Sequence, residues 1–391
     1  MPLCIAFIPA YTLIDTIFPE NKGNITMNAK VELYGWEVSP YTAKVDAYFH
    51  FKGIPFNKIY PNAYTLARKI QPAVGKMIMP VVYINGKKPI QDSTIIIDHF
   101  EQQNPTRAAI PASPKQRIAA QLIELYSDEW LPMAALHYRW NYPENYNFII
   151  GEFGSNALPY FPKFIQNKVA KTFAGKMSGY LPILGITSNT EQALEQHVEA
   201  LLSLLNTHFA QHRYLLGDQP CLADFSLYGP LYAHLHRDPA PKDLVAKHRN
   251  VLTWIERVQG NTSTENNTLP DNDQIPDTLI PILSHMTQSH MPLLQQTIDA
   301  IQQWAKEKHT GDKVPQRLGD ATLSIEGKQE TRYNLSYGYW MLQRIQETYQ
   351  TVSEENKPPV DEFITQLNGF SLLKEPLHNH VMLKNCRLYL S

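Results

Sequence analysis

The sequence is poor in cysteine, in net charge and in long apolar runs. Its 391 residues include three cysteines, Cys4, Cys221 and Cys386, with no Cys-x-x-Cys spacing, which excludes a disulfide-held scaffold. The 35 Lys and Arg nearly balance the 37 Asp and Glu, without a basic cluster that would follow a phosphate backbone, so we expect no nucleic-acid partner. No window of about 20 uncharged apolar residues occurs, which excludes a transmembrane helix, and we expect no membrane partner.

Motifs for metal, phosphate and nucleophilic-serine chemistry are also missing. The sequence has no Gly-rich phosphate loop, no Gly-x-Ser-x-Gly and no His-Glu-x-x-His. His234 and His236, like His378 and His380, are two residues apart, which puts them on different faces of a helix. We therefore expect no metal site.

The composition that is present is that of a folded protein with several parts. An apolar fraction of 43% excludes general disorder, and the length allows two or three domains. Shifts in pattern divide the chain into an N-terminal extension (1–29), an α/β block (30–105), a helical block (106–260), a polar linker (261–276) and a mainly helical C-terminal extension (277–391). The opening stretch has no basic start and carries Asp15, which is atypical of a secretory signal, so we expect a cytoplasmic protein.

The α/β block alternates short apolar strands with amphipathic helices. A Ser-Pro pair at residues 39–40 begins a helix that Gly53 ends. Asn-Gly at residues 85–86 predicts a hairpin, with a return strand over 87–90. A further helix is expected from 93 to about 102.

The rest of the chain is read mostly as helices. Apolar periodicity predicts helices over residues 114–130, 191–209 and 224–235, whereas the aromatic stretch 137–162 is too irregular to assign. In the extension we expect helices over 278–308 and 335–355 with a hairpin near 326–327. Their apolar faces must be buried on the body, in a small third domain or on another subunit.

Several short motifs occur in a fixed order. They are Leu33-Tyr34-Gly35, Ser39-Pro40-Tyr41, Lys52-Gly53-Ile54-Pro55-Phe56, Met79-Pro80-Val81-Val82 and Gln91-Asp92-Ser93-Thr94, followed by Tyr214-Leu215-Leu216-Gly217-Asp218 and Ala223-Asp224-Phe225. In this order they resemble the glutathione S-transferase family over roughly residues 30–258. The resemblance implies a thioredoxin-like α/β N-terminal domain and an all-α C-terminal domain, to which this chain adds its mainly helical extension.

The resemblance also implies glutathione as co-substrate and Ser39 as the catalytic residue. A free thiol with a pKa near 8.5 is only about 3% thiolate at pH 7, and the thiolate is the nucleophile. Ser39 would donate its hydroxyl to that thiolate at a helix start, although a plain capping role is the alternative. A serine cannot form the mixed disulfide that family members with cysteine form here. Tyr34 is expected to turn to the other face of its strand.

Five residues match the family's glutathione-binding positions. The resemblance implies that Pro80 follows a cis bond and that Met79 pairs its backbone with the cysteinyl amide of glutathione. Ser93 would bind the γ-glutamyl carboxylate at a helix start, and Asp92 would meet the ammonium. Lys76 is placed as a contact to the peptide, although the segment before Pro80 is longer than the family's usual one. Capping is the alternative for Asp92 and Ser93.

Two further predictions concern the helical block. Asp224 matches a buried family aspartate that caps a central helix, so we expect a structural role. Tyr138, Trp140 and Tyr142 are candidates for the wall of a pocket for a small hydrophobic electrophile, and aromatic core packing is the alternative.

Two functions remain open at this point. The first is a cytosolic glutathione transferase acting in detoxification, which the family implies to be a homodimer. The second is a non-catalytic binding or scaffolding protein that kept the fold and uses the C-terminal extension as its interaction surface.

Overall fold

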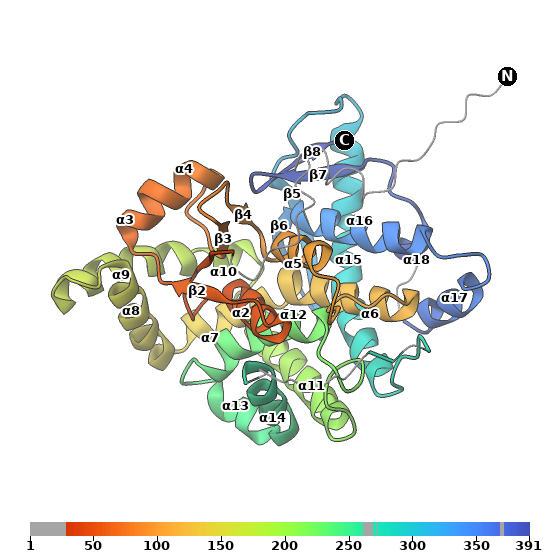
Figure 1. Cartoon of the computed structure of the whole chain (residues 1–391), viewed down its shortest axis with the longest axis horizontal. Helices are drawn as coiled ribbons and strands as arrows, with labels where there is room; N and C mark the ends of the chain where they lie inside the picture. The colour runs from red at the N-terminus through yellow and green to blue at the C-terminus, as the bar shows by residue number, and fades with distance from the viewer. Residues whose placement is uncertain (1–28, 261–268, 271, 368–370) are drawn as a thin grey trace.

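The computed structural model describes residues 29–260, 269–270, 272–367 and 371–391 of the 391-residue chain (Figure 1). The predicted N-terminal extension lies outside the described residues except for residue 29, and so does much of the predicted linker.

The N-terminal part is a four-stranded mixed sheet with helices. Its elements are β1 (Val31–Tyr34), α2 (Pro40–Lys52), β2 (Phe56–Ile59), α3 (Ala63–Thr65), the π-helical turn η1 (Leu66–Ile70), α4 (Gln71–Val74), β3 (Val81–Ile84), β4 (Ile90–Gln91) and α5 (Ser93–Gln103). The strand order is β2-β1-β3-β4, with β2 parallel to β1 and both other pairs antiparallel. This is the α/β fold that the sequence predicts.

The turns of this part follow from their residues. Asn85 and Gly86 both have positive φ, 52° and 66°, as a two-residue hairpin turn requires, although the return strand covers only Ile90–Gln91. Gly53 ends α2 at a φ of 66°, and its N–H donates to the His50 carbonyl.

The middle part is a helical body. Its elements are α6 (Pro114–Leu125), η2 (Tyr126–Trp130), α7 (Pro132–Asn141), α8 (Pro143–Ala157), α9 (Lys163–Ser178), α10 (Tyr180–Ile183), α11 (Glu191–Phe209), α12 (Leu222–Pro230), η3 (Leu231–His236), α13 (Lys242–Lys247) and α14 (Arg249–Gln259). The stretch over 137–162 that the sequence left unassigned holds the end of α7 and all of α8. Both of these helices have a proline at the first position, Pro132 in α7 and Pro143 in α8, which gives each a defined start.

Close packing joins the first two parts. Helix α12 packs on α2 and α6, and Figure 1 shows α2 between the sheet and the helical body. A Cβ at Gly229 in α12 would lie 2.6 Å from the carbonyl oxygen of Pro40. Any larger residue there would push the start of α2 away from the body.

The C-terminal extension packs on both preceding parts, and we call residues 277–391 the tail. Its elements are α15 (Leu279–Ala305), β5 (Arg317–Ile325), β6 (Lys328–Leu335), α16 (Tyr337–Gln350), α17 (Lys357–Gln366), α18 (Ser371–Lys374), β7 (Val381–Lys384) and β8 (Arg387–Leu390). Helix α15 contacts α11 and α6, and α16 contacts α6. Both predicted helices and the hairpin at 326–327 are present, while the sequence reading missed the hairpin β7–β8.

Two capping hydrogen bonds tie the segment before the tail to the helical body. The carboxylate of Asp273, in the predicted linker, accepts hydrogen bonds from the backbone N–H groups of Lys115 and Gln116, both at 3.1 Å. These groups have no partner within the first turn of α6, so the segment before the tail supplies the cap of that helix.

Candidate active site at one end of the sheet

Strand register brings most of the predicted glutathione-binding residues to one end of the sheet. Tyr34 at the end of β1 pairs with Val81 at the start of β3, and Val81 pairs with Gln91 at the end of β4. The chain leaves β1 toward Ser39, enters β3 from the Met79–Pro80 bond and leaves β4 into Asp92. These three segments therefore meet at the same edge.

Ser39 is the N-cap of α2 and is partly exposed. Its Oγ accepts a hydrogen bond from the backbone N–H of Thr42 at 3.3 Å, and Pro40 occupies the first helical position. Ser39 therefore caps α2, which is the alternative role given above. This hydrogen bond is long, however, and the hydroxyl hydrogen of Ser39 remains available to an acceptor. The other N–H groups of the first turn point the same way.

The loop that carries Ser39 is fixed by buried hydrogen bonds. Trp36 donates its indole N–H to the Pro61 carbonyl at 2.9 Å. Arg139 donates from Nη1 to the Val38 carbonyl at 2.9 Å and binds both carboxylate oxygens of Asp238, at 2.8 and 3.0 Å. An arginine from α7 therefore holds the backbone next to Ser39.

Gly35 is needed for the close approach of this loop to α2. A Cβ at Gly35 would lie 2.4 Å from the Thr42 side chain. Tyr34, one residue earlier, is buried against Tyr83, with its hydroxyl bonded to Glu32, so it turns away from the Ser39 loop as predicted.

The Met79–Pro80 peptide bond is cis, as the resemblance implies. Pro80 is buried and Met79 half-buried. Lys76 is also half-buried, and burial lowers its pKa.

Asp92, rather than Ser93, is the N-cap of α5. The Asp92 Oδ1 accepts hydrogen bonds from the N–H groups of Thr94 and Ile95, at 3.0 and 3.3 Å. Its φ of 85° is unusual for a residue other than glycine. Ser93 follows as the first helical residue and is buried.

The tail reaches this second helix start. Tyr337, the first residue of α16, donates its hydroxyl to Asp92 Oδ2 at 2.5 Å. Burial raises the pKa of the Asp92 carboxyl, and the hydrogen bond from Tyr337 opposes that rise. Seven residues further along α16, Arg344 binds both carboxylate oxygens of Asp98 in α5, at 2.6 and 3.1 Å.

The hairpin β7–β8 contacts the same edge. Cys386, in the turn of this hairpin, donates its thiol to Gln91 Oε1 at 2.8 Å and lies 3.7 Å from the Val74 carbonyl. Burial raises the pKa of this thiol, and the positive charge of Lys76 opposes the rise. The tail therefore contacts residues on both sides of the Asp92 position.

A buried lysine joins the two helix starts. Lys44 in α2 binds Asp128 at 2.6 Å and Glu124 at 2.8 Å, and Glu124 also accepts from the Thr94 hydroxyl at 2.9 Å. Burial acts to lower the pKa of Lys44, but these carboxylates outweigh it and raise the pKa. Tyr41 donates its hydroxyl to the Asp128 carbonyl at 2.9 Å, which adds a second link from α2 to η2.

The three aromatic candidates lie in and just after α7. Tyr138 and Trp140 are buried, and Tyr138 stacks on Tyr142 with ring centroids 5.6 Å apart. Tyr142 donates its hydroxyl to Glu195 at 2.7 Å. Trp140 contacts Phe153, whose ring lies 5.7 Å from that of Trp36. Trp140 alone is thus linked, through Phe153, to the loop before Ser39.

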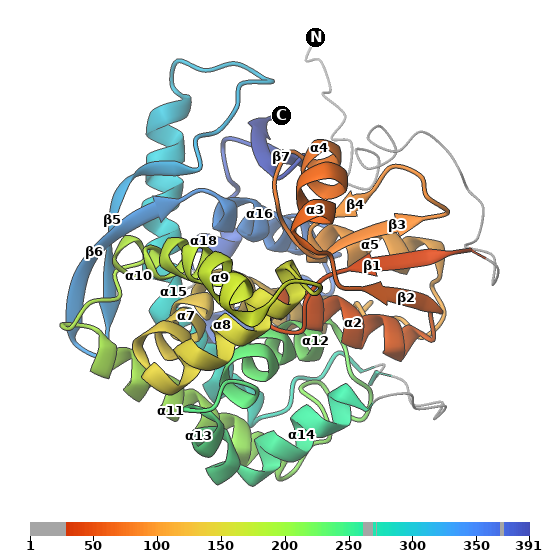
Figure 2. The same ribbon diagram turned by 90° about the vertical axis from the view of Figure 1, so that its left-hand side faces the viewer.

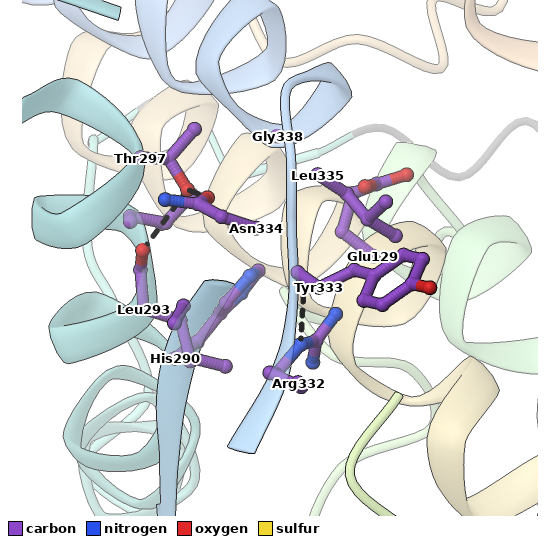
Figure 3. A pocket seen from close by; sticks show the side chains of 11 residues that line it. Glu129, His290, Leu293, Thr297, Arg332, Tyr333, Asn334, Leu335 and Gly338 are labelled. Atoms are coloured by element: carbon purple, nitrogen blue, oxygen red, sulfur yellow. Dashed lines mark hydrogen bonds between the residues drawn. The ribbon is translucent and has the colours of Figure 1, made fainter. Parts of the chain in front are cut away.

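A small cavity of about 30 Å³ lies between the tail and η2. Figure 3 shows His290 and Thr297 from α15, Arg332 and Asn334 from β6, and Glu129 from η2 around it. Burial raises the pKa of Glu129 to about 8, with the Asp128 charge adding to the rise, while burial lowers the pKa of Arg332 to about 10.

Asp224 is buried within the helical body. Its carboxylate accepts from the N–H groups of Leu215 and Cys221 at 3.0 Å each, from the Trp254 indole at 2.9 Å and from the Cys221 thiol at 3.4 Å. These bonds join three segments of the body, namely the turn at Leu215, the start of α12 and α14. Such contacts agree with the structural role expected for Asp224.

Metal and membrane features can be stated only for the described part of the chain. Within it, no three His, Cys, Asp or Glu side chains are grouped so as to hold a metal ion. No helix there has the length and apolar character needed to cross a membrane.

Sequence reasoning missed three residues at this edge. The sequence analysis assigned no site role to Tyr337, Gln91 or Cys386, because nothing in the local sequence pattern indicates that the tail contacts the sheet. The sequence does contain a signal for the buried carboxylates that bind Lys44. Glu124 and Asp128 are spaced i, i+4 within a strongly apolar helix, which indicates two acidic side chains on one buried face.

Sequence comparisons agree with this geometry. The sequence profile of the glutathione S-transferase N-terminal domain matches residues 33–108, and that of the C-terminal domain matches residues 189–257. These two parts of the chain belong to the glutathione S-transferase family. Residues 109–188, which hold α6 to α10, and the tail lie outside both matches.

Curated proteins with sequences similar to this chain come from Arabidopsis thaliana. It is similar to glutathione S-transferase U8, with 30% identity over 120 residues, 29% of this chain and 52% of that protein. It is similar to glutathione S-transferase U7 at 27% identity over 110 residues, 27% of this chain and 47% of that protein. The chain thus spans about half the length of the curated relatives it matches.

Solved structures with a similar fold have lower identity. The β-etherase LigF from Sphingobium sp. strain SYK-6 is 17% identical, covers 59% of this chain and 95% of its own, and gives a TM-score of 0.40. A glutathione S-transferase of Ceriporiopsis subvermispora in complex with glutathione is 18% identical, covers 62% and 99%, and gives 0.39. At these scores the likeness supports no detail of the site.

Proposed function

We propose that this chain is a glutathione transferase in which Ser39 stabilises the glutathione thiolate for attack on a small hydrophobic electrophile. The observation that carries the proposal is the partly exposed Ser39 hydroxyl at the N-terminus of α2, at the sheet end that also holds the cis bond before Pro80. Met79 would pair its backbone with the cysteinyl part of glutathione, as an added strand does.

The energy required is within reach of this geometry. Lowering a thiol pKa by about two units needs ~2.7 kcal/mol of selective stabilisation of the anion. A helix N-terminus contributes roughly 0.3 to 2 kcal/mol. A hydrogen bond to a charged acceptor adds about 1.5 to 3 kcal/mol, so Ser39 and the first turn of α2 together suffice.

The γ-glutamyl end of glutathione would lie at the start of α5. There Ser93 and the positive end of the helix dipole suit its carboxylate, and Asp92 suits its ammonium. Since Asp92 Oδ2 already accepts from Tyr337, the ammonium would share this oxygen or replace the tyrosine hydroxyl. Lys76 would contact the peptide from the turn after α4.

The electrophile would lie beside Ser39 toward the helical body. Of the aromatic candidates, Trp140 is the one that the ring of Phe153 links to Trp36, so we place it nearest this pocket. Tyr138 and Tyr142 would support it from behind. A homodimer, a cytoplasmic location and a role in detoxification belong to the same proposal.

The experiment compares two serines that each precede a proline at a helix start. Ser39→Ala should lower kcat/KM with a reactive aromatic halide by roughly ten- to hundredfold, because the thiolate loses its hydroxyl donor. Ser113→Ala is the matched control, since Ser113 precedes Pro114 of α6 and its hydroxyl donates to Gln116 Oε1 at 3.0 Å. Equal activity of the two variants would rule out the proposed role of Ser39.

The alternative is a non-catalytic binding or scaffolding protein that uses the tail. The observation in its favour is that the tail already contacts Gln91 and Asp92 at the glutathione edge. Calorimetry with millimolar glutathione separates the two functions. Absence of any heat of binding would favour the scaffold.

A further inference from the structure

Exposed aromatic and methionine side chains are gathered in two segments of the chain. Every large apolar side chain that is exposed in the described part of the molecule belongs to residues 60–77 or 160–180. The most exposed are Tyr160 at 93%, Phe164 at 74% and Tyr64 at 73%. Single exposed apolar residues are ordinary on a protein surface, whereas clustered ones mark contact surfaces. This clustering therefore indicates a binding partner.

The two segments lie on one side of the molecule. Helix α3, which contains Tyr64, contacts α8. Figure 1 shows α3, α4, α8 and α9 together at the left, and Figure 2 shows them on the face turned to the viewer. We call α8, α9 and their connecting turn (residues 143–178) the arm, and residues 153–178 of the arm together with residues 60–77 the aromatic face.

The charge of these segments has one sign. Residues 47–91 and 153–190 contain no Asp or Glu, whereas they contain seven and four Lys or Arg. All 37 acidic residues therefore lie elsewhere, with the remaining 24 basic ones. Neither segment forms a continuous basic run, so the asymmetry shows only when the fold brings them together.

The basic residues of the arm are free to bind an external anion. Lys163, Lys168, Lys171 and Lys176 are exposed, and none forms an ion pair with a described residue. Phe164, Lys168 and Lys171 follow each other at i, i+4 and i+7, so they share a face of α9.

The packing of α9 leaves most of its surface uncovered. The helix buries only Gln166, Ala170 and Ala174, and it packs on α8. Tyr160 and Phe161 are exposed in the turn at the start of α9. The arm is thus a helical hairpin with apolar rings and lysines side by side and little cover from the body.

We propose that the aromatic face binds the surface of membranes that contain anionic phospholipid. Helices that lie in the membrane interface combine lysines with exposed phenylalanines, and their binding depends on both. Lysine stems lie along apolar surface while the ammonium groups reach the lipid phosphates. This contact needs no spanning helix, but it departs from the expectation that the protein has no membrane partner.

The charges argue against a second copy of the chain as the occupant, and the exposed rings argue against nucleic acid. A second copy that used the same face across a two-fold axis would bring like charges together. Nucleic acid would pair with the lysines, but the rings would need a groove or exposed bases to pack against. A lipid surface accommodates the charges and the rings at once.

The test is co-sedimentation of the full chain with lipid vesicles. We expect binding to vesicles of phosphatidylcholine with phosphatidylglycerol, weak binding to phosphatidylcholine alone, and release by salt. Lys168→Glu/Lys171→Glu should lower binding roughly tenfold or more. Phe164→Ser should lower it at unchanged charge.

The matched control changes charge equally at another site. Lys306→Glu/Lys328→Glu replaces two exposed lysines of the tail and should leave vesicle binding close to wild type. Equal binding to both kinds of vesicle, or equal losses in the two double variants, would overturn the proposal. Absence of vesicle binding would also overturn the proposal. In that case, a mobility shift of a DNA duplex would indicate nucleic acid as the occupant, and a dimer that Phe164→Ser dissociates would indicate a second copy. Circular dichroism of each variant verifies that it is folded.

Discussion

The starts of helices α2 and α5 use the same physical feature in different ways. Each presents backbone N–H groups at one end of the sheet, and each carries a capping side chain. Ser39 accepts one long hydrogen bond, of 3.3 Å, and stays partly exposed. Asp92 accepts three, one of them from Tyr337 of the tail at 2.5 Å. One start is left for a ligand, while the other is already engaged by the chain itself.

This difference gives the tail a place in the site. A two-domain transferase ends before the tail begins, and here the added residues contact the α5 start rather than the α2 start. The tail therefore acts on the end of the site proposed for the γ-glutamyl group, and leaves the proposed thiolate position alone. Variants that act on one start, or on the link between them, test this asymmetry.

The largest effect is expected from the link. Lys44→Met removes the buried cation that holds Glu124 and Asp128, and loss of one partner of a buried pair costs about 3 to 5 kcal/mol. Lys58→Met is the matched control, because Lys58 also binds two carboxylates, those of Glu37 and Asp46, but at a more exposed site. There the loss should be about 1 kcal/mol or less.

Urea unfolding of the two lysine variants measures the contrast. A loss of equal size would show that burial of the Lys44 group contributes nothing special to joining the helix starts. A larger loss for Lys58→Met would reverse the assignment of the link.

A smaller effect is expected from the tail contact. Tyr337→Phe removes one hydrogen bond to a carboxylate, which should cost about 1 to 3 kcal/mol. It also frees Asp92 Oδ2, so we expect glutathione to bind more tightly. Tyr339→Phe is the control, because its buried hydroxyl donates to the Asn379 carbonyl at 2.6 Å, away from this edge.

Calorimetry with glutathione reads out this comparison. Tyr339→Phe should lose stability without a gain in affinity. If both variants bind glutathione as the wild type does, Asp92 does not meet the ligand, and the proposed γ-glutamyl position is wrong.

The sequence predicted the parts of the site that depend on neighbouring residues. Ser39 before Pro40, the Asn-Gly turn at residues 85–86 and the start of α5 each have a signal within a few positions, and the structure has them as expected. The contact between Asp92 and Tyr337 joins residues 245 apart, and only tertiary packing brings them together. The arm was missed for another reason, since the prolines and aromatic residues at the start of α8 looked irregular although Pro143 begins a helix.

A pH-dependent effect is expected from Glu129 at the cavity between η2 and the tail. Burial raises the pKa of Glu129 from 4.5 to about 8, so the folded protein binds this proton more tightly than the unfolded chain. Stability is therefore full below pH 4.5 and falls as the pH rises through about 8, where the folded state must hold a buried charge. Glu129→Gln removes that charge and should reduce the fall in Tm between these two pH values. Glu354→Gln, at an exposed carboxylate, should leave the fall unchanged. Parallel curves of Tm against pH for wild type and Glu129→Gln would show that Glu129 is ionised in the folded protein. Arg332 would then compensate its charge, and an ion pair across the cavity would join the tail to the body.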